Sequence, residues 1–123
     1  MIDTHCHLVS SQLAPDLEAV LERATQAGVD GMITVATGPG DTLEGLAVAK
    51  AHDHVWCSAG IHPHEADAPH DFGPMLIAAQ DERCVAWGEL GLDWYYKTPS
   101  REEQQALLEE QLTAIEGSGV ELP

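Results

Sequence analysis

Basic residues are scarce in this sequence. Its 123 residues include 5 lysines and arginines against 21 aspartates and glutamates, which gives a formal net charge of −16. A surface of this charge repels polyanions, so the composition argues against general, non-specific binding of nucleic acid. It does not exclude a nucleic-acid substrate at a metal site, because bound cations invert the local field. The acidity is also compatible with a high-salt cytoplasm.

Long apolar runs, an export signal and paired cysteines are missing as well. No stretch approaches the roughly 18 consecutive apolar residues of a transmembrane helix, and the first residues lack the basic and apolar segments of a signal peptide. The three cysteines, Cys6, Cys57 and Cys84, form no CxxC pair, which is typical of reduced thiols in a cytoplasmic protein. With 44% hydrophobic residues, the chain is expected to be one globular domain over residues 1–123, without a membrane segment.

Strand and helix signals alternate four times along the chain. Apolar runs predict strands and amphipathic segments predict helices; the strands are 1–7, 31–35, 55–60 and 85–89, and the helices are 14–27, 41–52, 72–80 and 100–116. Capping boxes mark two helix starts, at Asp41 and Ser100, and Leu108, Leu112 and Ile115 form the expected apolar stripe of the last helix. Such alternation predicts an α/β fold with a parallel sheet, equal to half of an eight-unit (β/α) barrel of the TIM type.

Polar side chains follow three of these strands where each strand ends. The segments are His-Cys-His at 5–7, Gly-Ile-His-Pro-His at 60–64 and Gly-Glu-Leu-Gly-Leu-Asp at 88–93. Because side chains alternate along a strand, His5 and His7 share a face with Asp3, whereas Cys6 turns to the other face. The carboxyl ends of parallel strands meet at one edge, so we predict that His5, His7 and Glu89 lie together. Two imidazoles and a carboxylate are a ligand set for a divalent metal.

Simpler interpretations of these residues remain open. A His-x-His pair is common by chance, and an acid after a strand can serve only to solvate a loop. His62 is either a loop histidine bonded to the backbone or a residue beside the metal. Asp93 is a metal ligand, an acceptor that orients a histidine or a turn residue, and we favour the second role.

Half of the aromatic residues come directly after the third motif. Trp94, Tyr95 and Tyr96 are three of six aromatic residues, and Lys97 and Arg101 are two of the five basic residues. Aromatic rings stack on bases and cations hold phosphates, so this segment could hold a nucleotide. Packing against the following helix is the alternative.

The three motifs, in their order and spacing, closely resemble the TatD family of metal-dependent deoxyribonucleases. The resemblance implies an eight-unit barrel of the amidohydrolase type that hydrolyses DNA, with 3′-to-5′ exonuclease activity, at a centre of two divalent ions (Mg²⁺, Mn²⁺ or Zn²⁺). On that resemblance, His5 and His7 bind one metal and Glu89 is the bridging carboxylate and catalytic residue. His62 and Asp93 carry over only as motif residues near the centre, which contact the substrate or orient the ligands.

The sequence departs from the family pattern after the third motif. Family members continue with histidines at the ends of the fifth and sixth strands and a late aspartate, and this chain has none of the three. We interpret the chain as the amino-terminal half of such an enzyme, from a shortened gene or an incomplete sequence. We expect it to be inactive alone and to self-associate through exposed strand edges. The alternatives are a hydrolase of a small cyclic amide or ester and a non-catalytic half-barrel that pairs with another chain.

Overall fold

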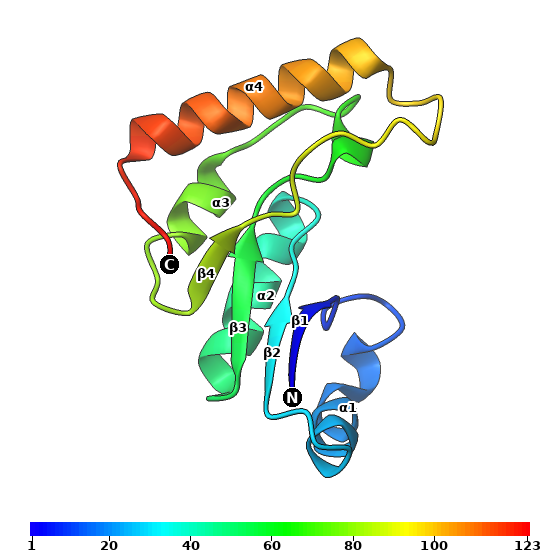
Figure 1. The fold of residues 1–123 in the computed structure, drawn as a ribbon, viewed down its shortest axis with the longest axis vertical. Helices are drawn as coiled ribbons and strands as arrows, with labels where there is room; N and C mark the ends of the chain where they lie inside the picture. Colours follow the sequence, from blue (N-terminus) through cyan, green and yellow to red (C-terminus); the bar gives the residue numbers. More distant parts are fainter.

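Each strand of the computed structural model, which describes residues 1–123, is followed by a helix (Figure 1). The elements, with η for short 3₁₀ helices, are β1 (Ile2–Cys6), η1 (Ala14–Asp16), α1 (Leu17–Gln26), β2 (Gly31–Thr34), α2 (Pro39–Ala51), β3 (Val55–Ala59), η2 (Pro63–Glu65), α3 (Gly73–Ala78), β4 (Cys84–Trp87) and α4 (Arg101–Ser118). None of these helices has the length and apolar character that crossing a membrane requires.

The four strands form one parallel sheet in the order β1-β2-β3-β4. Met32 of β2 lies beside Val55 of β3, and Cys57 of β3 lies beside Cys84 of β4. Strand order therefore follows chain order, as in half of a β/α barrel, and the predicted α/β class is confirmed. Strands β1 and β4 each pair on one side only, so both outer edges of the sheet are free.

One apolar cluster joins a single face of the sheet to all four α-helices. Val55, Cys57 and Ala59 alternate along β3 and are completely buried on this face. The helices contribute Leu21, Ala49, Met75 and Ala78, with Ala114 and Ile115 at the margin. The polar residues His5, His7 and Glu89 lie outside this core, at the carboxyl ends of the outer strands.

The two predicted capping boxes have different outcomes. At α4 the prediction is confirmed: the Ser100 hydroxyl accepts a bond from Glu103 N at 3.2 Å, and the Glu103 carboxylate accepts one from Ser100 N at 2.7 Å. At α2 the prediction is wrong, because the helix begins two residues earlier, at Pro39, whose fixed φ suits a first helical position. Asp41 lies inside the first turn and accepts a bond from Gly38 N at 2.8 Å.

The predicted apolar stripe of α4 is confirmed for Ile115, which packs against the core, and is wrong for Leu112. Leu112 is 46% exposed, and the buried residues are Gln104, Leu107 and Gln111. Helix α4 lies across η2 and α3, beside the loops that follow the strands (Figure 1). Those loops carry peptide groups that need hydrogen-bond partners, which glutamine side chains provide and leucines cannot.

Candidate metal centre

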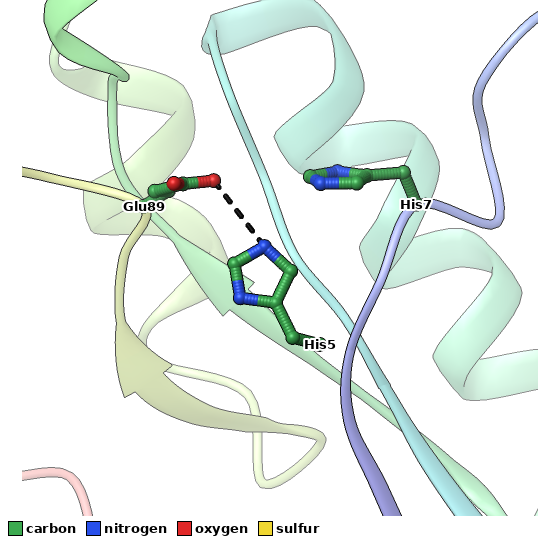
Figure 2. A group of neighbouring side chains, drawn as sticks. All are labelled: His5, His7 and Glu89. Carbon is green, nitrogen blue, oxygen red and sulfur yellow. Dashed lines mark ion pairs between the residues drawn. The ribbon is translucent and has the colours of Figure 1, made fainter.

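Three predicted site residues meet at the carboxyl edge of the sheet (Figure 2). His5 lies near the end of β1, His7 comes just after it, and Glu89 lies two residues beyond β4. One ligand atom from each side chain lies within 4.8 Å of the others. They line a hollow of about 390 Å³ that has no apolar side chain in its wall; the lining residues are His5, His7, Thr37, His62, His64, Glu65 and Glu89.

The Glu89 carboxylate lies between two imidazoles. Its Oε2 is 3.5 Å from His5 Nε2, and its Oε1 is 3.5 Å from His62 Nε2. The side chain keeps 32% of its surface exposed, so solvent reaches it. Each oxygen thus faces a different imidazole.

The His7 ring is oriented by the neighbouring strand. Its Nδ1 lies 3.1 Å from the carbonyl oxygen of Val35. A carbonyl only accepts, so Nδ1 carries the proton and donates this bond, which leaves the lone pair of Nε2 available. Figure 2 shows the ring directed toward His5 and Glu89. A backbone partner on one nitrogen and a free lone pair on the other are typical of metal-binding histidines.

Cys6 turns away from this cluster, as strand alternation predicts. Its Sγ donates to the carbonyl oxygen of Ile33 at 3.3 Å, and the side chain packs against the apolar core. Burial, reinforced by the nearby Asp3 carboxylate, raises the pKa of the Cys6 thiol to about 11. The thiolate that a metal would bind is therefore disfavoured at neutral pH.

The loop between β2 and α2 supports the backbone of the centre. Ala36 O accepts a bond from Glu89 N at 2.7 Å, and Thr37 O accepts one from His62 N at 2.8 Å. Thr37 is itself held by Asp41, whose Oδ2 accepts from its backbone N at 2.9 Å and from its hydroxyl at 2.7 Å. Sequence reasoning missed this role of Asp41, because the capping-box pattern placed Asp41 at the start of the helix.

Ser58 joins the ends of three neighbouring strands. Its hydroxyl donates to Gly88 O at 2.6 Å and accepts from Ala36 N at 3.1 Å, and the residue is 3% exposed. Two residues later, the Cα of Gly60 comes so close to Gly88 that an added Cβ would lie 2.7 Å from the Gly88 carbonyl carbon. Gly88, the residue before Glu89, is therefore held by the hydrogen bond from Ser58 and by its close contact with Gly60.

His62 points a donor at Glu89. Its Nδ1 accepts a bond from His64 N at 3.0 Å, so in the neutral ring the proton lies on Nε2, the atom that faces Glu89. Burial lowers the pKa of His62, although the charge of Glu89 opposes this effect. Both roles considered from sequence are thus present: one nitrogen bonds the backbone, and the other lies beside the cluster.

Asp93 lies outside the three-residue cluster and contacts a different histidine. His64 Nε2 donates to Asp93 Oδ2 at 2.8 Å, and Tyr95 N donates to Oδ1 at 3.0 Å. The Tyr95 N–H lowers the pKa of the Asp93 carboxyl, and the His64 bond acts in the same direction against partial desolvation. Asp93 therefore orients His64, a residue that sequence reasoning did not single out.

Two buried glutamines of α4 hold the loops that carry these residues. Gln111 Oε1 accepts from Ile61 N at 2.8 Å, and its Nε2 donates to Ile61 O at 3.0 Å. Gln104 makes the same pair of bonds with Asp93, both at 2.8 Å. Neither side chain is more than 1% exposed. Their spacing of seven residues puts both on one helix face, a signal that a search for apolar stripes alone does not detect.

Comparisons with known proteins give consistent matches. The family model described as TatD related DNase matches residues 2–117. The 3′-5′ ssDNA/RNA exonuclease TatD of Salmonella typhimurium is 34% identical over 114 residues, which cover 91% of this chain and 44% of that protein. The uncharacterized metal-dependent hydrolase YjjV of Escherichia coli is 36% identical over 115 residues, covering 90% of this chain and 44% of that protein.

A solved structure also matches the fold. The crystal structure of YJJV, described as a TatD homolog from Escherichia coli, superposes with a TM-score of 0.81 at 35% identity. The match covers 98% of this chain and 48% of that one. The chain thus spans less than half the length of these relatives.

Proposed function

Because the chain belongs to the TatD related DNase family, we propose that its polar edge is the metal-dependent centre of an enzyme that hydrolyses single-stranded DNA from the 3′ end. In this proposal His5 and His7 bind one divalent ion, and Glu89 bridges it to a second. The ion is Mg²⁺, Mn²⁺ or Zn²⁺. Imidazole nitrogens and a carboxylate oxygen suit divalent ions of this kind.

The observation that carries the proposal is the meeting of three donors from the two outer strands of the sheet, with ligand atoms within 4.8 Å. The surroundings fit an ion as well, since the hollow has no apolar lining and His7 keeps a free nitrogen. A divalent ion bound there would polarise a phosphodiester oxygen and activate a water molecule.

The other residues of the edge have supporting roles in this proposal. His62, whose Nδ1 accepts a bond from His64 N, offers its Nε2–H to a phosphate oxygen next to Glu89. Asp93 fixes the ring of His64 through the 2.8 Å bond. Ser58 and the Ala36 carbonyl hold the backbone around Glu89, so that its two oxygens keep their separate directions.

Metal titration tests the proposal directly. We expect the 123-residue chain to bind one Mn²⁺ or Zn²⁺ in isothermal titration calorimetry, and His5→Ala and Glu89→Ala to weaken binding at least tenfold. His70→Ala is the matched control, because His70 contacts Ala66 and Glu110 outside the cluster. Equal affinity of the parent chain and His5→Ala would remove the basis of the proposal.

Activity is a separate test. Three protein ligands can hold one ion, whereas hydrolysis between two ions needs more, so we expect no Mg²⁺- or Mn²⁺-dependent turnover by the 123-residue chain. A version extended to the length of the relatives should degrade a single-stranded oligodeoxynucleotide and should lose that activity on Glu89→Ala. Metal-dependent turnover by the 123 residues alone, abolished by His5→Ala, would contradict the two-ion count.

A further inference from the structure

We propose that the loop Trp94–Thr98 is a nucleotide subsite beside the metal cluster, in which Tyr96 stacks on a base and Lys97 binds a phosphate of a single-stranded nucleic acid. The inference rests on the proposed function and extends it by naming where the substrate lies next to the cleavage point.

The position of the loop is the first argument. A second hollow, of about 400 Å³, is lined by His64, Tyr96, Lys97 and Thr98. It shares His64 with the hollow of the metal cluster. A nucleic-acid strand with one phosphate next to Glu89 would therefore meet a polar and aromatic surface at the same edge of the protein.

The aromatic residues of the loop are divided in their packing. Trp94 is 46% exposed, and Arg101 Cζ of helix α4 lies 4.5 Å from its ring centroid. Tyr96 remains 56% exposed, and its ring stands nearly perpendicular to that of His64, with centroids 5.1 Å apart. Tyr95 is 86% exposed but does not line the hollow, so Tyr96 is the exposed ring next to the cluster, and an exposed ring of this kind stacks on any base.

The charge of Lys97 is the second argument. Two of the five basic residues, Lys50 and Arg83, pair with aspartates, and Arg101 lies over Trp94. Lys97 makes no ion pair, and it lines the hollow next to the cluster. In a chain of net charge −16, an unpaired cation at this edge is a local attraction for phosphate.

A buried side chain also holds both ends of the loop. Gln104, 1% exposed, donates to Asp93 O at 2.8 Å and to Pro99 O at 3.1 Å, and accepts from Asp93 N at 2.8 Å. Both ends of the loop are thus attached to one amide group. A loop ordered before binding loses less conformational entropy when a ligand arrives.

The test compares a labelled oligothymidylate of ten nucleotides with a ten-unit abasic strand, which has the phosphates without the bases. Fluorescence anisotropy at low ionic strength, with the 123-residue chain, should show Tyr96→Ala binding oligothymidylate about tenfold more weakly, because a base stack is lost. Tyr96→Ala should leave the abasic strand unaffected, and Tyr96→Phe should bind both strands like the parent chain.

The phosphate contact has its own readout. Lys97→Gln should weaken binding of both strands and reduce the slope of log affinity against log salt by about 0.7, the value for one phosphate contact on a single strand. Arg23→Gln removes the same charge from an exposed position on α1 and should change binding less than twofold.

Three results would overturn the subsite. They are the absence of saturable binding of oligothymidylate by the parent chain, affinities of Tyr96→Ala and Lys97→Gln within twofold of the parent, and an equal loss with Arg23→Gln. Mn²⁺ titration separates the two proposals, since Tyr96→Ala should keep the parent affinity for the metal. If Tyr96→Ala weakens binding of oligothymidylate but His5→Ala leaves the affinity for Mn²⁺ unchanged, the nucleotide subsite stands and the proposed metal centre is wrong.

Discussion

Glu89 receives its position from backbone contacts and not from its own strand. Strand β4 ends at Trp87, and the Glu89 amide bonds to Ala36 O at 2.7 Å. Gly88 comes just before it. Its carbonyl oxygen accepts a hydrogen bond from the Ser58 hydroxyl, and its backbone lies close to Gly60. The directions of the two Glu89 oxygens therefore depend on how closely the segments after β3 and β4 approach each other.

Gly60→Ala tests that dependence. The added Cβ would lie 2.7 Å from Gly88 C and 3.0 Å from its Cα and O, all backbone atoms that no rotamer change can move. We expect the free energy of unfolding, measured in urea, to fall by about 1–3 kcal/mol, as for other overpacked sites. Metal affinity should fall with it, because Glu89 is the residue after Gly88.

The control for this substitution is another glycine. A Cβ on Gly117, inside α4, would meet nothing within 4 Å. Gly117→Ala should stabilise the chain by about 0.5–1 kcal/mol, since alanine loses less conformational entropy in a helix. If both variants unfold at the same urea concentration, the close approach at Gly60 does not constrain the site.

At the scale of the elements, patterns that depend on neighbouring residues were predictable and those that depend on distant partners were not. Alternating apolar runs located all four strands, and Ser100 located the start of α4, because both signals are local. The inward face of α4 was missed, since Gln111 bonds to Ile61, 50 residues away. Asp41 was missed as a support of Thr37, although the two are only four residues apart, because the capping-box pattern placed Asp41 at the start of the helix.

The candidate site shows the same division. His5 and His7 were predictable as neighbours because two residues on one strand share a face, and Glu89 because carboxyl ends of parallel strands meet. The contact of Asp93 with His64 could not be predicted, since it joins an irregular loop to the short helix η2, which lie far apart in the sequence. Periodicity gives no information about such loops.

Gln111→Leu tests the contribution of α4. The leucine would fill the space but leave the buried N–H and C=O of Ile61 without partners, at about 1–3 kcal/mol for each group. We expect a loss of unfolding free energy of about 2–4 kcal/mol, together with faster hydrogen exchange at the Ile61 amide.

Gln105→Leu is the matched control on the same helix. Gln105 is exposed, so this substitution should change stability by no more than about 0.5 kcal/mol. Equal stability of the two variants would mean that the Gln111 bonds contribute nothing beyond side-chain packing.

For the molecule as a whole, the sheet has two free edges, on β1 and β4. Unpaired N–H and C=O groups at such edges can pair with another chain. We therefore predict that the 123-residue chain self-associates, and that association increases with salt because its net charge of −16 repels other copies at low ionic strength. Light scattering that gives the monomer mass of 13.2 kDa at high concentration and high salt would contradict this.

The location of a bound metal tests the assignment of this edge. Crystals of the chain grown with Zn²⁺ and measured at the zinc absorption edge should show an anomalous peak about 2.0–2.2 Å from ligand atoms of His5, His7 and Glu89, the usual length of zinc bonds to nitrogen and oxygen. A strong peak at another group of histidines, with none at these three residues, would contradict the assignment of this edge as the metal centre.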